Sequence, residues 1–379
     1  MRRYDIDALR VIVFGLLIFY HLGMFFVPWD FHLKNSVTYD WLKYPMIFLN
    51  RWRLPLLFVI SGIGTFFNIT KRNGWNFVGE RFMRLFIPLV VGMLLIVPPQ
   101  VYFERLDAGQ FYGNYFEFWI SSAFSGGAYP EGNISWHHLW FLPYLLLYSI
   151  VLTPVFIYLR NHPQTWIIRK TKRLISCKFG LLLLVIPLMF WEIFLRPRFP
   201  STHGLLDDWY NHVNYGTLFF YGFLLMTVKD TLWENITKHR RMYLICGVII
   251  YILMTYIEFV AGYTPHKYTL NTLLFHLLWA TFEWTWILVI ISYAVVYLNK
   301  PSRKLSYTTE AVYPFYILHQ SVIIALGFYL KNVEMCLFAK FSVMVIGTFG
   351  ITWLIYEIGI RRHAWIRPLF GMKRIKDYE

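Results

Sequence analysis

The stretch DIDALRVIVFGLLIFYHLG, residues 5–23, decides the fold class, because an apolar run of this length is long enough to cross a membrane. The composition of the whole chain points the same way. Hydrophobic residues make up 57% of the 379 positions and charged residues only 15%. A soluble domain of this length is less apolar and more charged. The sequence therefore predicts an all-α integral membrane protein.

Ten apolar stretches are long enough, at roughly 20 residues, to cross the hydrocarbon core of a bilayer. They cover residues 7–28, 46–69, 84–104, 138–159, 178–196, 213–229, 241–261, 268–298, 308–330 and 335–360. The stretch at 268–298 is long for one straight helix, so tilting or a break stays open. Because no soluble segment, linker or repeat separates the stretches, we expect residues 1–379 to form a single polytopic membrane domain.

The basic residues, which give a net charge of +15, fall in short clusters between the apolar stretches. These clusters include Arg2 and Arg3, Lys71 and Arg72, and the tail that begins at Arg361. Clusters in alternate loops are typical of cytoplasmic segments, so both termini are expected in the cytoplasm, and no nucleic-acid partner is expected. The first stretch lacks a small-residue cleavage site, which favours an uncleaved span over a secretory signal.

Arg10 and His21 interrupt the apolar part of the first stretch. They are 11 residues apart, which places them within roughly 20° of one helix face and about 16 Å apart along the axis. Arg10 is therefore expected near the cytoplasmic surface and His21 near mid-membrane. An ionisable side chain at that depth is costly and usually marks a pathway or a reaction site. A histidine that only packs between helices is the alternative.

Two further polar residues are expected at the depth of His21. Ser61 in the stretch 46–69 and His319 in the stretch 308–330 each lie about 15 Å from the expected cytoplasmic end of their helix. Each also has a structural interpretation: Ser61 with Gly62 as a small-residue packing contact, and His319 as a buried, hydrogen-bonded histidine.

Arg81 and Arg84 precede and open the third stretch, in the segment GERFMRLFIP. Because they are three residues apart, their guanidinium groups project from one helix face at the membrane surface. A planar fork of donors suits phosphate oxygens. Arginines at a cytoplasmic boundary also follow from topology alone. Together with Arg10 and the polar residues below it, the pair favours a phosphate-bearing ligand that enters from the cytoplasm.

Several motifs in this order resemble the membrane acyltransferase family 3, also called the AT3 or glycan O-acyltransferase family. The similar segments are Arg10-x10-His21, FVISG at 58–62, Arg81-x-x-Arg84, HHLWFLPYL at 137–145, YPFYILHQS at 313–321 and LIYEIGIRR at 354–362. The resemblance covers nearly the whole chain. It looks closest to the glucan biosynthesis protein C branch, through Arg53 eight residues before Ser61 and Pro88 four residues after Arg84.

The resemblance implies transfer of a short acyl group, acetyl or succinyl, from cytoplasmic acyl-coenzyme A to a hydroxyl of an extracytoplasmic glycan, by an enzyme of the inner membrane. No metal is expected. Arg81 and Arg84, with Arg10, would hold the phosphates of coenzyme A. His21 would act as general base, or as a transient acyl carrier, because an imidazole titrates near neutrality.

Other residues take supporting roles in this interpretation. Asp7 would orient Arg10 through a local ion pair. Ser61, His319 or Tyr316 would donate a hydrogen bond to the developing oxyanion, and the sequence does not choose among them. At the cytoplasmic end of the last stretch, the spacing of Glu357 and Arg361 predicts a local ion pair.

On the outer side, His138 and Trp140 match the family motif and would form an acceptor-binding lip, since aromatic faces and imidazoles suit a sugar. An interfacial aromatic belt is the structural alternative. Arg53 needs an anionic partner, either the carboxylate of a succinyl donor, the acceptor, or one carboxylate of the chain. The carboxylates considered are Glu192, Glu258 and Glu283.

A secondary transporter or acyl-group translocator is the rival class, because intramembrane His, Arg and Glu residues also build proton and anion pathways. Against it, no pair of Gly/Pro-interrupted spans stands at corresponding places in two halves. A purely structural scaffold would leave the intramembrane polar residues unexplained. Cys177, Cys246 and Cys336 lie far apart, so we expect neither a disulfide framework nor a metal site from them.

Overall fold

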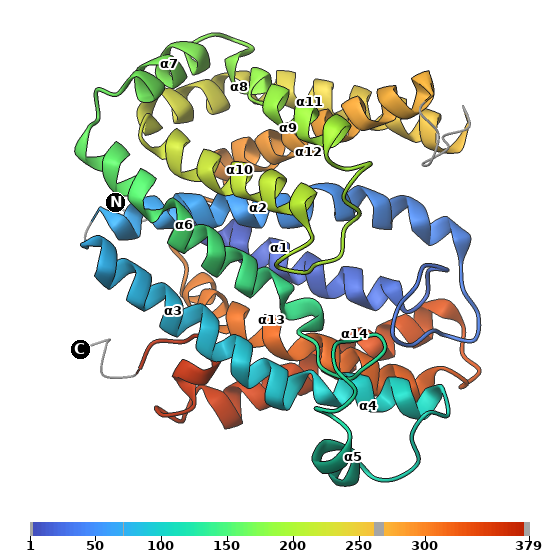
Figure 1. Cartoon of the computed structure of the whole chain (residues 1–379). Coiled ribbons are helices and arrows are strands. Elements are labelled where there is room, and N and C mark those ends of the chain that lie inside the picture. The colour runs from blue at the N-terminus through green and yellow to red at the C-terminus, as the bar shows by residue number, and fades with distance from the viewer. Residues whose placement is uncertain (1–2, 71, 261–268, 375–379) are drawn as a thin grey trace. The chain divides into compact units, whose positions relative to one another are not determined.

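The structure, a computed structural model, describes residues 3–70, 72–260 and 269–374 (Figure 1). Within these ranges the chain forms helices and no strand. Eight of the helical segments are long and apolar enough to cross a membrane. The predicted all-α membrane class is therefore confirmed. Arg2, Lys71 and the span ends at residues 261 and 268 lie outside the described residues.

The eight candidate spans match eight of the ten predicted stretches. They are Tyr4–Met24, Asp40–Ile69, Gly74–Asp107, His137–Asn161, Lys229–Glu258, Leu270–Tyr297, Arg303–Leu330 and Leu337–Ile360. The stretch predicted at 178–196 forms two short helices, α8 (Gly180–Leu183) and α9 (Val185–Phe194), and the stretch at 213–229 falls mostly in α10 (Trp209–Met226). Ten spans and cytoplasmic termini thus stay predictions. The long stretch at 268–298 forms one unbroken helix, α12 (Leu270–Tyr297).

The chain divides into two compact units, and each is built from separated segments of sequence. The first unit takes the described parts of Met1–Arg10, Asn50–Val78 and Leu147–Leu305; the second takes those of Val11–Leu49, Gly79–Leu146 and Ser306–Glu379. Because α1 (Tyr4–Met24) and α2 (Lys43–Ile69) contribute residues to both units, the chain does not separate into two consecutive halves.

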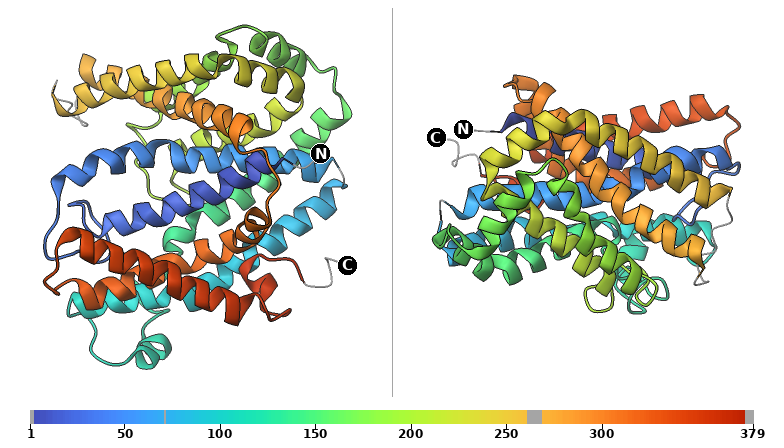
Figure 2. Two further views of the ribbon diagram at one scale, coloured as in Figure 1. Left: turned by 180° about the vertical axis from the view of Figure 1, so that it is seen from behind. Right: turned by 90° about the horizontal axis from the view of Figure 1, so that it is seen from above.

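The first unit contains α7 to α12, parts of α1, α2 and α6 (Phe141–Asn161), and the first residues of α3 (Gly74–Val91) and α13 (Arg303–Leu330). Within it, α7 covers Trp166–Ile175 and α11 covers Lys229–Phe259. Helices α11 and α12 lie side by side in Figure 1 and in the two views of Figure 2, and α12 also packs against α9. Many outward side chains of α11 are apolar, as expected for a helix that faces lipid.

Helices α2 and α10 cross at two glycines that lie back to back. A Cβ atom on Gly222 would lie 2.1 Å from the carbonyl oxygen of Val59 and 3.0 Å from the Cα of Gly62. Small residues at helix crossings let backbones approach closely within membranes. The small-residue packing contact that was the structural alternative for Ser61 and Gly62 is therefore present, and Gly62 is the residue that makes it.

We expect Gly222→Ala to destabilise the protein by about 3 kcal/mol, because the added methyl group meets backbone atoms that cannot rotate away. The matched control is Gly216→Ala in the same helix, where the nearest atom to a new Cβ is 3.8 Å away, on the Tyr148 ring. The thermal midpoint of the purified protein in detergent should fall for Gly222→Ala and not for Gly216→Ala. Equal midpoints would contradict the close crossing.

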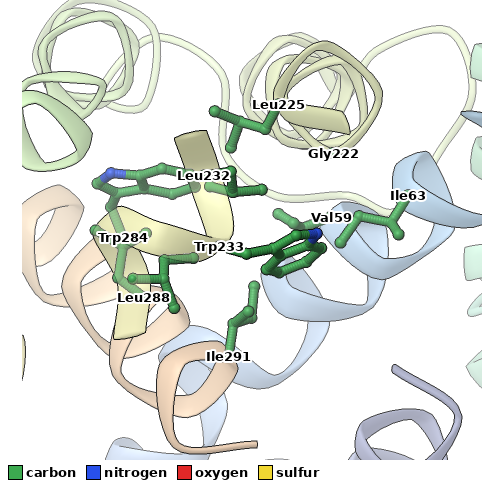
Figure 3. A pocket seen from close by; sticks show the side chains of 10 residues that line it. Val59, Ile63, Gly222, Leu225, Leu232, Trp233, Trp284, Leu288 and Ile291 are labelled. Atoms are coloured by element: carbon green, nitrogen blue, oxygen red, sulfur yellow. The ribbon is translucent and has the colours of Figure 1, made fainter. Parts of the chain in front are cut away.

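Next to this crossing, an apolar pocket lies within the first unit (Figure 3). Its lining comes from α2, α10, α11 and α12, and the labelled side chains, among them Trp233, Trp284 and Ile291, point toward one another. The indole Nε1 of Trp284 donates to the carbonyl oxygen of Leu181 at 2.7 Å. Since no titratable side chain lines this pocket, it offers no group for acid–base chemistry.

The second unit holds the other parts of α1, α2 and α6, most of α3 and α13, and the remaining helices with their connecting loops. Its elements are η1 (Asp40–Leu42), α3 (Gly74–Val91), η2 (Gly92–Ile96), α4 (Pro98–Asp107), α5 (Tyr115–Ser121), η3 (His137–Trp140), α13 (Arg303–Leu330), α14 (Leu337–Leu354), η4 (Ile355–Ile360) and η5 (Arg367–Phe370). A core of buried residues from α1, α13 and α14, including Leu22, Ile323 and Met344, fixes the second half of α1 in this unit. The candidate site forms where α1 and α13 meet.

Candidate active site

His21 and His319 meet inside the second unit. The Nδ1 atom of His21 lies 2.7 Å from the Nε2 atom of His319, with the ring planes within 4° of parallel. His319 is fully buried, and its Nδ1 lies 2.7 Å from the carbonyl oxygen of Tyr316. The structure thus brings together two residues that the sequence placed only at a common depth.

The hydrogen bonds fix the tautomer of both rings in their neutral forms. A carbonyl oxygen can only accept, so the Nδ1–H of His319 donates to the Tyr316 carbonyl and leaves a lone pair on its Nε2. That lone pair accepts from the Nδ1–H of His21. The Nε2 of His21 consequently carries a lone pair rather than a proton, which is the state that a general base requires.

His138 and Tyr316 surround this pair, but not as an exposed lip. The Nε2 of His138 donates to the carbonyl oxygen of Ile317 at 3.0 Å, and its ring centroid is 5.1 Å from that of His319. The phenol of Tyr316 donates to the carbonyl oxygen of His138 at 2.6 Å. His138 is 6% exposed and Trp140 7% exposed. Both therefore lie inside the unit, and Tyr316 would have to give up its present bond to reach an oxyanion.

Three polar residues that the sequence interpretation missed extend this network. Gln100 donates from its Nε2 to the Oγ of Ser321 at 2.8 Å and accepts at its Oε1 from Gln320 at 3.1 Å. The same Nε2 atom lies 3.4 Å from the Nδ1 of His138. A signal was present in the sequence, since Gln100 interrupts an apolar run and Gln320 directly follows His319. Amides in apolar helices usually bond across helices.

Arg81 and Arg84 lie one turn apart in α3, as predicted. Arg84 is exposed and approaches Glu80 to 3.6 Å, whereas Arg81 is half-buried. The phenol of Tyr313, in α13, donates to the carbonyl oxygen of Arg84 at 2.9 Å and so fixes this part of α3 in the unit. A loose ion pair with Glu80 leaves the exposed guanidinium of Arg84 able to exchange it for a phosphate.

The predicted local pair of Glu357 is confirmed. Arg361 donates from Nη1 to both carboxylate oxygens of Glu357, at 3.0 and 3.1 Å. Tyr307 donates to Glu357 Oε2 at 2.9 Å, and Arg362 lies 3.8 Å away. Glu357 therefore has a structural role at the start of α13 and the end of η4, and a role in binding stays a prediction.

The other predicted site residues lie in the first unit. Arg10 and Asp7 form the expected i,i+3 pair, at 3.9 Å. The Nη2 of Arg10 lies against Gly64 of α2, where a Cβ would come within 3.7 Å. Ser61 is half-buried, and its carbonyl oxygen accepts from the Oγ1 of Thr65 at 2.9 Å. Roles in catalysis or phosphate binding for Arg10 and Ser61 stay predictions.

Arg53 is 1% exposed, deep in α2. The three carboxylates considered as its partners are engaged with other groups. Glu258 accepts from Arg51 at 2.9 Å, Glu192 accepts from Arg196 at 3.0 Å, and Glu283 accepts from the amide of Asn214 at 3.1 Å. The role of Arg53 in substrate binding stays a prediction.

Apolar helices around a hydrogen-bonded histidine pair, of which His319 is buried and His21 half-buried, define a membrane protein with an ionisable site among its spans. A family model described as an acyltransferase domain, Acyl_transf_3, matches residues 3–357. The chain therefore belongs to the membrane acyltransferase family 3, and it is a multi-pass membrane protein of an acyl-transferring class.

Curated relatives are similar to this chain over nearly its whole length. Glucans biosynthesis protein C of Salmonella typhi is 22% identical over 374 residues, which cover 95% of this chain and 92% of the relative. The protein of the same name from Salmonella typhimurium gives the same values. That from Escherichia coli is 20% identical over 373 residues, with equal coverage. No solved structure is significantly similar to this chain.

Proposed function

We propose that this protein transfers a short acyl group, acetyl or succinyl, from cytoplasmic acyl-coenzyme A to a hydroxyl of a glycan outside the inner membrane. The observation that carries the proposal is the His21–His319 hydrogen bond, because it leaves a basic nitrogen on His21 within an apolar helix bundle. Family membership supports acyl transfer, and the name of the relatives supports a glucan as acceptor.

His21 acts as general base in this mechanism. Its Nε2 takes the proton of the acceptor hydroxyl while the hydroxyl oxygen bonds to the thioester carbon. The carbon–sulfur bond then breaks, and the imidazolium returns the proton to the departing thiolate, so atoms and charge balance. His319 is a positioning residue: its Nε2 accepts from His21 Nδ1–H throughout and stabilises the imidazolium by hydrogen bonding.

Arg81 and Arg84 hold the phosphates of the donor. Two guanidinium groups on one face of α3 provide several charge-assisted donors for phosphate oxygens. Arg10, on the helix that carries His21, lies about 16 Å along the axis from it. That separation suits a donor whose phosphates are anchored at the membrane surface and whose thioester reaches further in.

The test is release of coenzyme A by the purified full-length protein in detergent. Acetyl-CoA and succinyl-CoA are offered separately, each with and without glucan oligosaccharides. We expect one donor to be cleaved at least about tenfold faster, with acyl groups recovered on the glucan. If neither donor is bound or cleaved with any glycan, acyl transfer is excluded, and uptake assays for a transporter would be the next measurement.

A further inference from the structure

A second cluster of polar side chains lies in the second unit, around the loops that follow α1 and α5. The Nδ1 of His32 lies 2.6 Å from Glu104 Oε2, and the phenol of Tyr129 donates to Glu104 Oε1 at 2.9 Å. Burial and the neighbouring Glu104 carboxylate raise the pKa of Tyr129, so its phenol keeps its proton and remains a donor. Glu104 thereby orients both rings.

His137 completes the cluster, and one of its ring nitrogens makes no hydrogen bond to the described residues. Its centroid is 4.4 Å from that of His32 and 4.8 Å from that of Tyr129, both edge to face. The Nε2 of His137 is buried and has no hydrogen-bond partner among the residues that the structure describes. A buried polar atom without a partner costs about 1–3 kcal/mol, so a ligand or water that supplied one would be bound favourably.

The backbone at His137 is strained as well. Its φ angle is +39°, a conformation that non-glycine residues rarely adopt. Such residues cluster at ligand sites, where the surrounding structure holds them in place. Here the hydroxyl of Ser135 accepts from the backbone N–H of His137 at 2.9 Å. This hydrogen bond and the ring contacts with His32 and Tyr129 hold the residue in that conformation.

The loops that carry the cluster are tied to the helices by cations. Arg105 donates to the carbonyl oxygens of Pro130 and Gly132, at 2.6 and 2.9 Å, and to the side chain of Asn133 at 3.0 Å. Lys340 of α14 donates to Asn35 at 2.7 Å. A cluster on loops fixed in this way is a preorganised surface, which lowers the entropic cost of binding a ligand.

We propose that His32, Tyr129 and His137, oriented by Glu104, bind a hydroxyl group of a neutral carbohydrate acceptor. This inference rests on the acyl-transfer function proposed above and identifies the acceptor subsite within it. The neighbouring charges of Glu104 and Arg105 offset each other, which favours an uncharged ligand. Imidazole and phenol rings offer both donors and acceptors for hydroxyls, together with flat faces for a sugar.

Phe31 lies between this cluster and His21. The ring of Phe31 lies 6.4 Å from that of His21 and 5.3 Å from that of His32. One aromatic side chain thus separates the base from the proposed acceptor subsite. An acceptor held by one hydroxyl at His137 would have a neighbouring sugar unit near His21.

The test compares His137→Phe and Tyr129→Phe, which keep the rings and remove the polar atoms. Matched controls are His162→Phe and Tyr112→Phe, at exposed positions. Binding of radiolabelled glucan oligosaccharides to the purified protein is measured without donor, and the Kd for acyl-CoA is measured separately. We expect about a tenfold higher glucan Kd in His137→Phe, a smaller rise in Tyr129→Phe, and unchanged acyl-CoA binding.

Each outcome decides one question. Equal glucan Kd values in the wild type and both ring variants, or no glucan binding by the wild type, would overturn the acceptor subsite. Glucan binding that depends on His137, without cleavage of any donor, would retain the subsite and exclude acyl transfer. If His137→Phe fails to fold, as judged by lost acyl-CoA binding, Tyr129→Phe decides alone, because it removes a single oxygen atom.

Discussion

Replacement of His21 by glutamine is expected to lower the kcat of acyl transfer by about a hundred- to ten-thousand-fold, the range that a general base contributes. Glutamine can still donate a hydrogen bond toward His319, but it cannot take a proton from the acceptor. The Kd for acyl-CoA should stay within about twofold of wild type, because His21 does not contact the phosphates in this mechanism. Single-turnover release of coenzyme A and equilibrium binding together measure both quantities.

His319 provides the matched comparison. His319→Gln keeps an acceptor oxygen for His21 Nδ1–H, whereas His319→Ala removes it. We expect His319→Ala to lose about a hundredfold in kcat and His319→Gln clearly less, with a pH–rate profile shifted relative to wild type in both. A merely structural histidine would change stability without moving the profile. Full activity of His21→Gln would contradict the role of His21 as base.

The double variant Arg81→Ala/Arg84→Ala is expected to raise the KM for acyl-CoA about a hundredfold or more. A hydrogen bond to a charged group contributes about 1.5–3 kcal/mol, and the variant removes two guanidinium groups. The effect should act on KM rather than kcat, because phosphate binding is made equally in the ground state and the transition state. Initial rates over a range of donor concentrations check this.

Arg169→Ala is the matched control, since Arg169 is an exposed arginine on α7, also at an expected cytoplasmic boundary. It should leave the KM for acyl-CoA unchanged. The wild-type KM should also rise with salt, because exposed charge pairs are screened, and this dependence should be weaker in the double variant. An unchanged KM in the double variant would show that the arginine pair marks topology only.

Much of the fold follows from the sequence because it depends on local properties. The length of an apolar run sets whether a helix can span a membrane, and eight of ten predicted stretches appear as candidate spans. The pairs Asp7–Arg10 and Glu357–Arg361 were predictable because residues three or four apart always share a helix face. Two stretches do not appear among them: helices of ten and four residues replace one span at 178–196, and α10 is 18 residues long but begins with the polar segment WYNHVNY.

The partners of the site residues were decided only by the tertiary structure. His21 and His319 are 298 positions apart, and helices that are apolar on most faces do not reveal from sequence which face turns inward. The same ambiguity hid the burial of His138 and the contacts of Gln100. The cluster at His137 depends on a loop conformation with positive φ that no local pattern indicates. The depth of a residue in the membrane depends on its own helix and is encoded locally. A contact between two residues depends on how several helices rotate and pack against one another.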